Sequence, residues 1–159
     1  MNQDTKEQFG IIIHLVKELV GIYRGAISQF GISENEFWIW YTLIIMKGEY
    51  SQQDICSTWS LSKQTVNTII MRMVQKDFAY LEMIPGTRNR KNIRLTETGK
   101  EYGEIIVRPI SDAEQRTLSR LSVKDCNACT AVLEGYIRIL KEEMYGTENR
   151  HYLQNMKIR

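Results

Sequence analysis

The sequence predicts a mainly α-helical protein with a small β-wing, arranged as a winged helix-turn-helix. Three observations support this fold class. The chain has only two prolines and ten glycines in 159 residues, and this composition favours long helices over a turn-rich β-sandwich. Six segments space their apolar residues as helices do. One short region with a Pro-Gly turn has the alternating pattern of a β-hairpin.

Two helices are predicted at the start of the chain. Apolar residues recur at helical spacing from Gln8 to Phe30, and Gly31 follows where a glycine commonly ends a helix. Ser33 and Glu36 then form the signature of a capping box. We therefore expect the second helix to run from Glu34 to about Met46.

A helix-turn-helix is predicted next. Ser51 is expected to cap a short helix, because Asp54 stands at the capping-box position. Ser62 opens another helix with an apolar stripe on one face and polar residues on the other. The short connection between the two helices, Ser60 to Ser62, has the length of a helix-turn-helix turn. The apolar stripe consists of Val66, Ile69, Ile70, Met73 and Val74.

The following residues predict the wing and two long helices. Strands are expected over Ala79 to Ile84 and Asn92 to Leu95, with a basic tip between them. Thr96 is expected to cap a long helix, which Pro109 should kink near residues 105–108. The last helix is expected to begin after Ser122 and to end at Gly146.

Composition excludes several classes of function. The longest apolar run is too short to span a bilayer, and the first ten residues lack the features of a signal peptide. Three cysteines, an odd number, fit a reducing compartment. We therefore expect a cytoplasmic protein with no membrane association. Motifs for catalysis and paired metal-ligand spacings are absent from the sequence, so we expect no enzyme activity, no cofactor and no metal.

Basic charge is concentrated between Ser60 and Thr96. This stretch contains seven Lys and Arg residues and two Asp and Glu residues, which gives it a net charge of +5. Because the whole chain carries only +2, the remainder carries −3. This distribution is typical of a nucleic-acid-binding surface.

The second helix of the helix-turn-helix is predicted to read bases, because the major groove admits one α-helix. Gln and Asn side chains form bidentate bonds to adenine, Lys reaches guanine, and a later Arg suits phosphate. The expected contacts from this helix are Ser62, Lys63, Gln64, Thr65, Asn67, Thr68 and Arg72. The first helix and the wing are expected to add Ser51, Gln52, Arg88, Arg90, Lys91 and Arg94.

The run from Ser51 to Glu101 resembles the MarR family of bacterial transcriptional regulators. Ser62 with Thr65-Val66 matches the family pattern S-x-x-T-V, and residues 95–99 match its L-T-x-x-G. The resemblance covers about residues 30–146. It implies a homodimeric repressor that binds double-stranded DNA at a palindromic operator and that a small ligand or another signal releases. It also implies a helical dimerisation region (1–31 and 97–146), a winged helix-turn-helix DNA-binding domain (32–96) and a C-terminal tail (147–159).

The sequence departs from the family pattern at two places. The usual Asp-x-Arg of the wing falls on residues 87–89, which read Thr-Arg-Asn, so Arg88 or Arg90 is expected to act at the wing tip. Asp77 stands where a glycine usually follows the recognition helix. Asp adopts the left-handed conformation more readily than most residues other than glycine, which makes the turn feasible.

Three further hypotheses stay open. A winged-helix protein-interaction module without DNA binding is one alternative. Cys126 and Cys129 are candidates for a thiol-redox switch, although cysteines on an amphipathic helix also pack as small hydrophobic residues. Aromatic residues are candidates for a small-molecule effector pocket, although such residues also form cores. The candidate pocket residues are His14, Tyr23, Phe37, Trp38, Trp40 and Tyr41.

Overall fold

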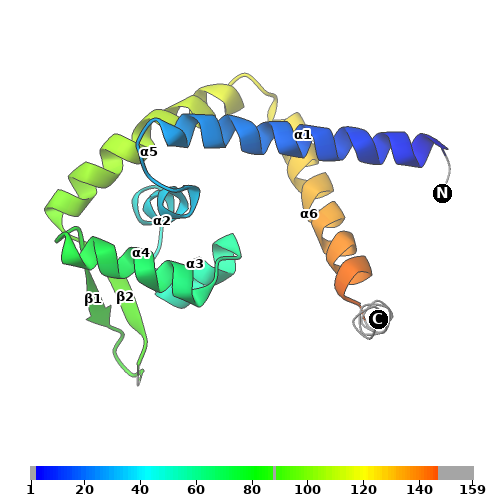
Figure 1. The fold of residues 1–159 in the computed structure, drawn as a ribbon. Helices are drawn as coiled ribbons and strands as arrows, with labels where there is room; N and C mark the ends of the chain where they lie inside the picture. The colour runs from blue at the N-terminus through cyan, green and yellow to red at the C-terminus, as the bar shows by residue number, and fades with distance from the viewer. Residues whose placement is uncertain (1–2, 88, 147–159) are drawn as a thin grey trace. The chain divides into compact units, whose positions relative to one another are not determined.

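The computed structural model describes residues 3–87 and 89–146, in which four helices precede one two-stranded sheet and two helices follow it (Figure 1). The chain divides into two units, Met1–Asp112 and Ala113–Arg159. The predicted mainly α-helical fold with a small wing is confirmed. The elements are α1 (Gln3–Ser28), α2 (Glu34–Ile44), α3 (Gln52–Trp59), α4 (Lys63–Gln75), β1 (Ala79–Met83), β2 (Lys91–Leu95), α5 (Glu97–Leu118) and α6 (Val123–Tyr145).

The first two helices differ from their predicted bounds only at the ends. Helix α1 starts before the predicted Gln8, and Asp4 in its first turn interacts favourably with the helix dipole. Gly31 follows it with a φ of 66°, in the region that favours glycine. Ser33 caps α2 by accepting a hydrogen bond from a backbone N–H, and α2 ends before the predicted Met46.

The helix-turn-helix forms as predicted. Ser51 and Asp54 make a complete capping box at the start of α3, each side chain accepting a hydrogen bond from the other's backbone N–H. Ser62 caps α4 by accepting a hydrogen bond from the Thr65 backbone N–H. Ser60 takes the left-handed conformation in the turn, with a φ of 53°. Asp77 does so after α4, with a φ of 57°, which confirms the prediction for that position.

The wing is a hairpin supported by the chain before α3. Strands β1 and β2 pair antiparallel, with Leu81 opposite Ile93. The Ile93 N–H donates to the Tyr50 carbonyl at 2.8 Å, and Ser51 forms a β-bridge with Asn92. Because an isolated two-stranded hairpin is only marginally stable in water, these contacts help to hold the wing in place.

The core of the first unit lies where the helix-turn-helix meets α2, α5 and the base of the wing. The apolar face of α4 points into it, as the spacing predicts. The Thr96 hydroxyl accepts a hydrogen bond from the Gly99 N–H and so caps α5, as predicted. The largest fully buried side chains are Trp40, Phe37, Ile27, Ile39, Ile55, Ile70 and Val66.

The C-terminal helices also follow their predicted order. Helix α5 continues past Pro109 to Leu118. The Ser122 hydroxyl accepts a hydrogen bond from the Asp125 N–H at 3.1 Å, and α6 ends at Gly146. The predicted tail, residues 147–159, lies outside the described residues. None of the helices formed by the described residues has the length and apolarity that a membrane span requires.

Candidate nucleic-acid interface

Helix α4 presents a row of exposed polar side chains opposite its buried face. Lys63, Gln64, Asn67 and Arg72 are all exposed. Among the residues that the structure describes, none is a hydrogen-bond or ion-pair partner of these four side chains. We call this set the α4 row. Its donors and acceptors are therefore available to a ligand.

The hydroxyl groups near the start of α4 are engaged within the helix. The Ser62 and Thr65 hydroxyl oxygens lie 2.7 Å apart, and the Ser62 oxygen also accepts the Thr65 N–H. The Thr68 hydroxyl donates to the Gln64 carbonyl at 2.8 Å. These hydrogen bonds fix the first turns of α4. One hydroxyl of the Ser62–Thr65 pair keeps its O–H for a partner, whereas the Thr68 hydroxyl keeps only acceptor capacity.

A groove of about 320 Å³ lies beside α4 and the start of α2. Most of its lining is polar, and it includes two members of the α4 row. The lining residues are Ser33, Asn35, Gln64, Thr65, Thr68, Ile69 and Arg72. The exposed surface of α4 therefore continues onto the first turn of α2.

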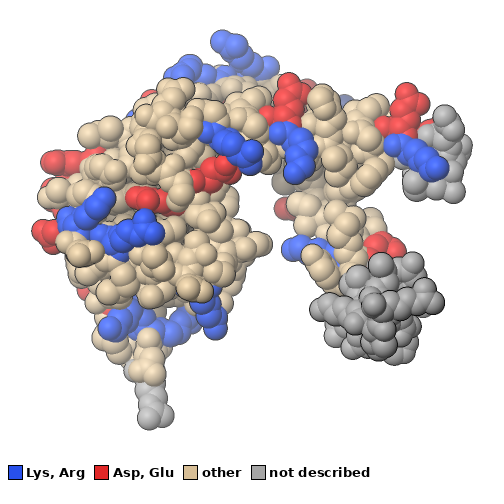
Figure 2. Space-filling model, in the orientation of Figure 1, with Lys and Arg blue, Asp and Glu red and all other residues tan. Residues whose placement is uncertain are grey.

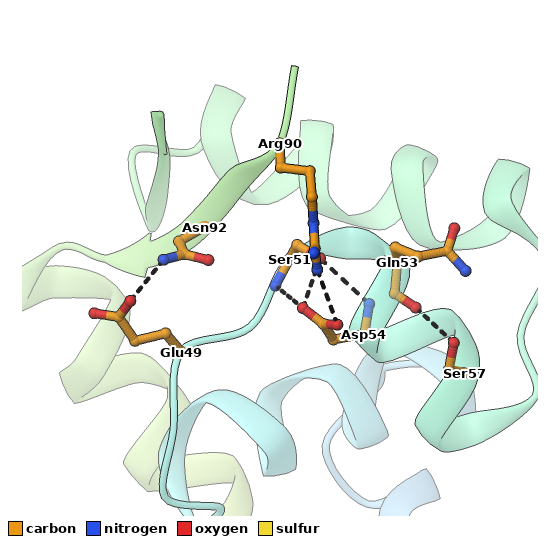
Figure 3. A network of polar contacts seen from close by, with 7 residues as sticks. All are labelled: Glu49, Ser51, Gln53, Asp54, Ser57, Arg90 and Asn92. Carbon is orange, nitrogen blue, oxygen red and sulfur yellow. Dashed lines mark hydrogen bonds and ion pairs between the residues drawn. The ribbon is translucent and has the colours of Figure 1, made fainter. Parts of the chain in front are cut away.

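The wing arginine Arg90 is held by a carboxylate of α3 (Figure 3). Its Nη2 lies 3.3 Å from Asp54 Oδ1. Hydrogen bonds from the hydroxyl and backbone N–H of Ser51, together with the charge of Arg90, lower the pKa of Asp54. Arg90 and its neighbour Lys91 remain exposed, whereas Arg88 lies outside the described residues.

Ser51 is expected from the sequence to contact DNA, which requires an exposed side chain, but the structure buries it. It is only 3% exposed, and its hydroxyl donates to Asp54 Oδ2 at 2.6 Å. Its side chain caps α3, which gives Ser51 a structural role, and its expected contact with phosphate stays a prediction. Gln52, the next residue, is half-buried and lines a cavity of about 270 Å³ between α3 and the wing.

Arg94, a partly exposed residue of β2, is paired with carboxylates of the protein. Its Nε donates to Glu82 Oε2 at 2.7 Å, and its Nη2 donates to Glu49 Oε1. These hydrogen bonds raise the pKa of Arg94. Glu49 Oε2 also accepts a hydrogen bond from Asn92 Nδ2 at 2.8 Å. Arg94 is thus paired with two carboxylates, and its expected contact with DNA stays a prediction.

Exposed cations lie on both α4 and the wing. Figure 2 shows lysine and arginine atoms over α4 and at the root of the wing. The count of +5 for residues 60–96 omits Glu49 and Asp54, which the fold brings against the wing. The positive charge available to a partner is therefore smaller than the sequence indicates, and among the described residues it includes Lys63 and Arg72 of α4 and Arg90 and Lys91 of the wing.

Four of the six predicted effector-pocket residues come together. They form a cluster of aromatic rings with Trp59 of α3, in which the Trp38 and Trp59 rings stack with centroids 4.6 Å apart. The Trp59 Nε1–H donates to the buried Thr42 hydroxyl at 2.7 Å. Sequence reasoning missed Trp59, because a single aromatic residue in a short helix indicates no partner. The cluster consists of Tyr23, Phe37, Trp38, Tyr41 and Trp59.

The other two predicted pocket residues lie elsewhere. The Trp40 ring is fully buried and packs against Phe78 and Tyr102, with centroids 5.9 and 5.4 Å away. His14 is exposed on α1, and its Nε2 lies 4.0 Å from the Glu18 carboxylate. A pocket that contains all six residues is therefore not assembled within the described chain.

The candidate redox pair lies on α6. Cys129 is exposed and Cys126 is half-buried, and both thiols are free. The packing that the sequence favours for them is incomplete within one chain, since α6 has no buried residue. Cys56 is buried in α3, as expected.

Comparison with known proteins identifies the fold. No model of a protein family matches the chain, and no curated protein matches it in sequence. The structure of NMB1585, a MarR family regulator from Neisseria meningitidis, matches with a TM-score of 0.74 and 24% identity over 91% of this chain and 98% of that one. AbsC, a MarR family transcriptional regulator from Streptomyces coelicolor, has a TM-score of 0.69 and 16% identity over 89% and 97%. The MepR–DNA complex of Staphylococcus aureus has a TM-score of 0.55 and 23% identity over 86% and 97%. The chain therefore has the fold of MarR family regulators.

Proposed function

We propose that the chain is a homodimeric transcriptional regulator of the MarR type, which binds specific double-stranded DNA through α4 and the wing. The observation that carries this proposal is the α4 row: exposed Lys, Gln, Asn and Arg side chains without partners among the described residues. These residue types bond to base edges and phosphates. The similarity in fold to MepR, which is solved in a complex with DNA, supports the same reading.

The proposed contacts divide into two kinds. Gln64 and Asn67 read base edges in the major groove, and Lys63 reaches guanine. Arg72 and the exposed wing cations contact phosphates and position the helix. The wing follows the neighbouring minor groove, where a narrow A·T-rich groove attracts arginine.

The proposed homodimer is supported by apolar surface that each unit leaves uncovered. On α1, Leu15 is 56% exposed and Ile22 is 64% exposed. On α6, Val132 is 70% exposed, and no residue of that helix is buried. Soluble proteins seldom leave such apolar faces in water, and a second copy of the chain would cover them. This supports dimerisation through the first and last helices.

The proposed regulation is repression that a ligand relieves. A small ligand that binds dimers with one spacing of the two recognition helices would shift the population away from the operator-competent form. We propose that the ligand contacts the partly exposed side of the aromatic cluster. This side consists of Tyr23 from α1 together with Trp38 and Tyr41 from α2.

Selection of bound duplexes from a random pool tests the function. We expect enrichment of an inverted repeat whose half-sites lie about 10 bp apart, one turn of DNA. Light scattering should give the mass of two chains for the free protein and the mass of two chains plus one duplex for the selected complex. A pool that shows no enrichment, or a chain that stays single in both states, would contradict the proposal.

A further inference from the structure

We infer that Glu49 is a positioning residue that sets the orientation of the wing for DNA binding. This inference rests on the proposed function. Glu49 lies in the loop between α2 and α3, outside both the α4 row and the wing. Its role would be to hold the wing from the side rather than to touch the duplex.

The Glu49 carboxylate binds two side chains of β2, one with each of its oxygens. Its Oε2 accepts a hydrogen bond from Asn92 Nδ2 at 2.8 Å, as Figure 3 shows. Its Oε1 accepts a charge-assisted hydrogen bond from Arg94 Nη2. Both partners are about 45 positions away along the chain, since the separations are 43 and 45 residues. The contact therefore fixes β2 against a distant loop.

Arg94 extends this link to the other strand of the wing. Its Nε donates to Glu82 Oε2 on β1 at 2.7 Å, while its Nη2 donates to Glu49. The guanidinium thus joins the loop, β2 and β1 at one point. Because a guanidinium is planar and donates in fixed directions, this arrangement restrains the angle of the hairpin as well as its distance.

The loop that carries Glu49 is itself anchored. The Tyr50 carbonyl accepts the Ile93 N–H at 2.8 Å, and the Tyr50 hydroxyl donates to the Lys47 carbonyl at 3.0 Å. The hairpin has only two strands of its own, and such a hairpin is marginally stable alone. The Glu49 contacts and the Ile93 bond thus support the wing together with the Arg90–Asp54 ion pair and the bridge from Ser51 to Asn92.

Positioning and simple electrostatics predict opposite effects for the loss of Glu49. The Glu49 side chain is 58% exposed and lies at the root of the proposed DNA-binding wing. Removing a negative charge near a polyanion should strengthen DNA binding if charge alone matters. If Glu49 positions the wing, the same change should weaken binding, because the wing cations lose their preferred placement.

The Glu49→Ala variant of the full-length protein tests the inference with the duplex selected above. We expect binding about two- to fivefold weaker, the upper part of the range for an exposed ion pair. The matched control is Glu97→Ala, which removes an equal charge whose ion pair with Lys100 stays within one turn of α5. Tighter or unchanged binding by Glu49→Ala, or an equal loss in the control, would overturn the inference.

A double-mutant cycle shows whether Glu49 acts through the wing. In a background of Arg90→Ala and Lys91→Ala, the Glu49→Ala change should have little further effect, because the wing contacts are already lost. An additive loss would overturn the inference.

Hydrogen exchange tests the same inference without DNA. In Glu49→Ala, the Ile93 amide should exchange faster, and unchanged exchange would overturn the inference. The exchange result does not depend on the proposed function. If the unmodified protein binds no duplex, the proposed function is wrong whatever the exchange result.

Discussion

Replacing Gln64 or Asn67 with alanine is expected to relax base preference at one base pair in each half-site by about 1–3 kcal/mol, or roughly five- to 150-fold in relative affinity. Both side chains are exposed on α4, and neither has a partner among the described residues. Alanine removes the amide that would form two hydrogen bonds to a base edge. The lost energy should therefore appear as lost discrimination between bases.

Competition binding with single-base variants of the selected duplex measures this effect. The matched control is Gln75→Ala, because Gln75 is an exposed glutamine at the far end of the same helix. The control should keep the preference of the unmodified protein. If Gln64→Ala and Asn67→Ala weaken binding to every sequence alike, these residues position the helix and do not read bases.

Replacing Gly99 with alanine is expected to lower the free energy of unfolding by about 3 kcal/mol, near the upper end for overpacking. A Cβ at this position would lie 1.8 Å from the Phe78 carbonyl oxygen and 2.7 Å from its carbon. The obstacle is backbone, and the Phe78 oxygen accepts the Thr96 N–H at 3.1 Å. The start of α5 must therefore move away from β1, and that hydrogen bond is strained or lost.

Chemical denaturation monitored by circular dichroism measures the change. Gly25→Ala is the matched control, since a Cβ there meets nothing within 4 Å and alanine favours a helix interior by up to about 1 kcal/mol. A Gly99→Ala protein as stable as the unmodified chain would show that α5 and the wing do not meet as described. The glycine of the L-T-x-x-G pattern thus has a physical reason, namely the close approach of two backbones.

The elements that sequence predicts well are those with local causes. Ser51, Ser62 and Ser122 each cap the helix that the spacing of apolar residues predicts, because a cap depends on residues within one turn. The left-handed turn at Asp77 follows from the same local reasoning. The polar side of α4 was predictable in full, since a helix separates its faces by a fixed period.

Contacts between distant residues set the limit of that reasoning. Arg94 counts as a free cation in the sequence, but the fold brings Glu49 to it from 45 positions away. Asp54 reaches Arg90 across 36 positions. A local count of charge therefore overstates the positive charge that the wing offers to a partner. It also cannot identify Glu49 as a contact of the wing. Trp40 shows the same limit. It lies two positions after Trp38 on α2, but Trp38 packs against Trp59 whereas Trp40 packs against Tyr102.

Salt dependence of duplex binding tests most directly whether α4 and the wing form a cationic surface for DNA. If six to ten phosphates are contacted, affinity should fall about 10³- to 10⁵-fold between 50 and 200 mM salt. The Arg90→Ala, Lys91→Ala double variant should bind more weakly and with a shallower slope. Affinity that does not change with salt, or no duplex binding at any salt concentration, would contradict the account and favour a protein-interaction module.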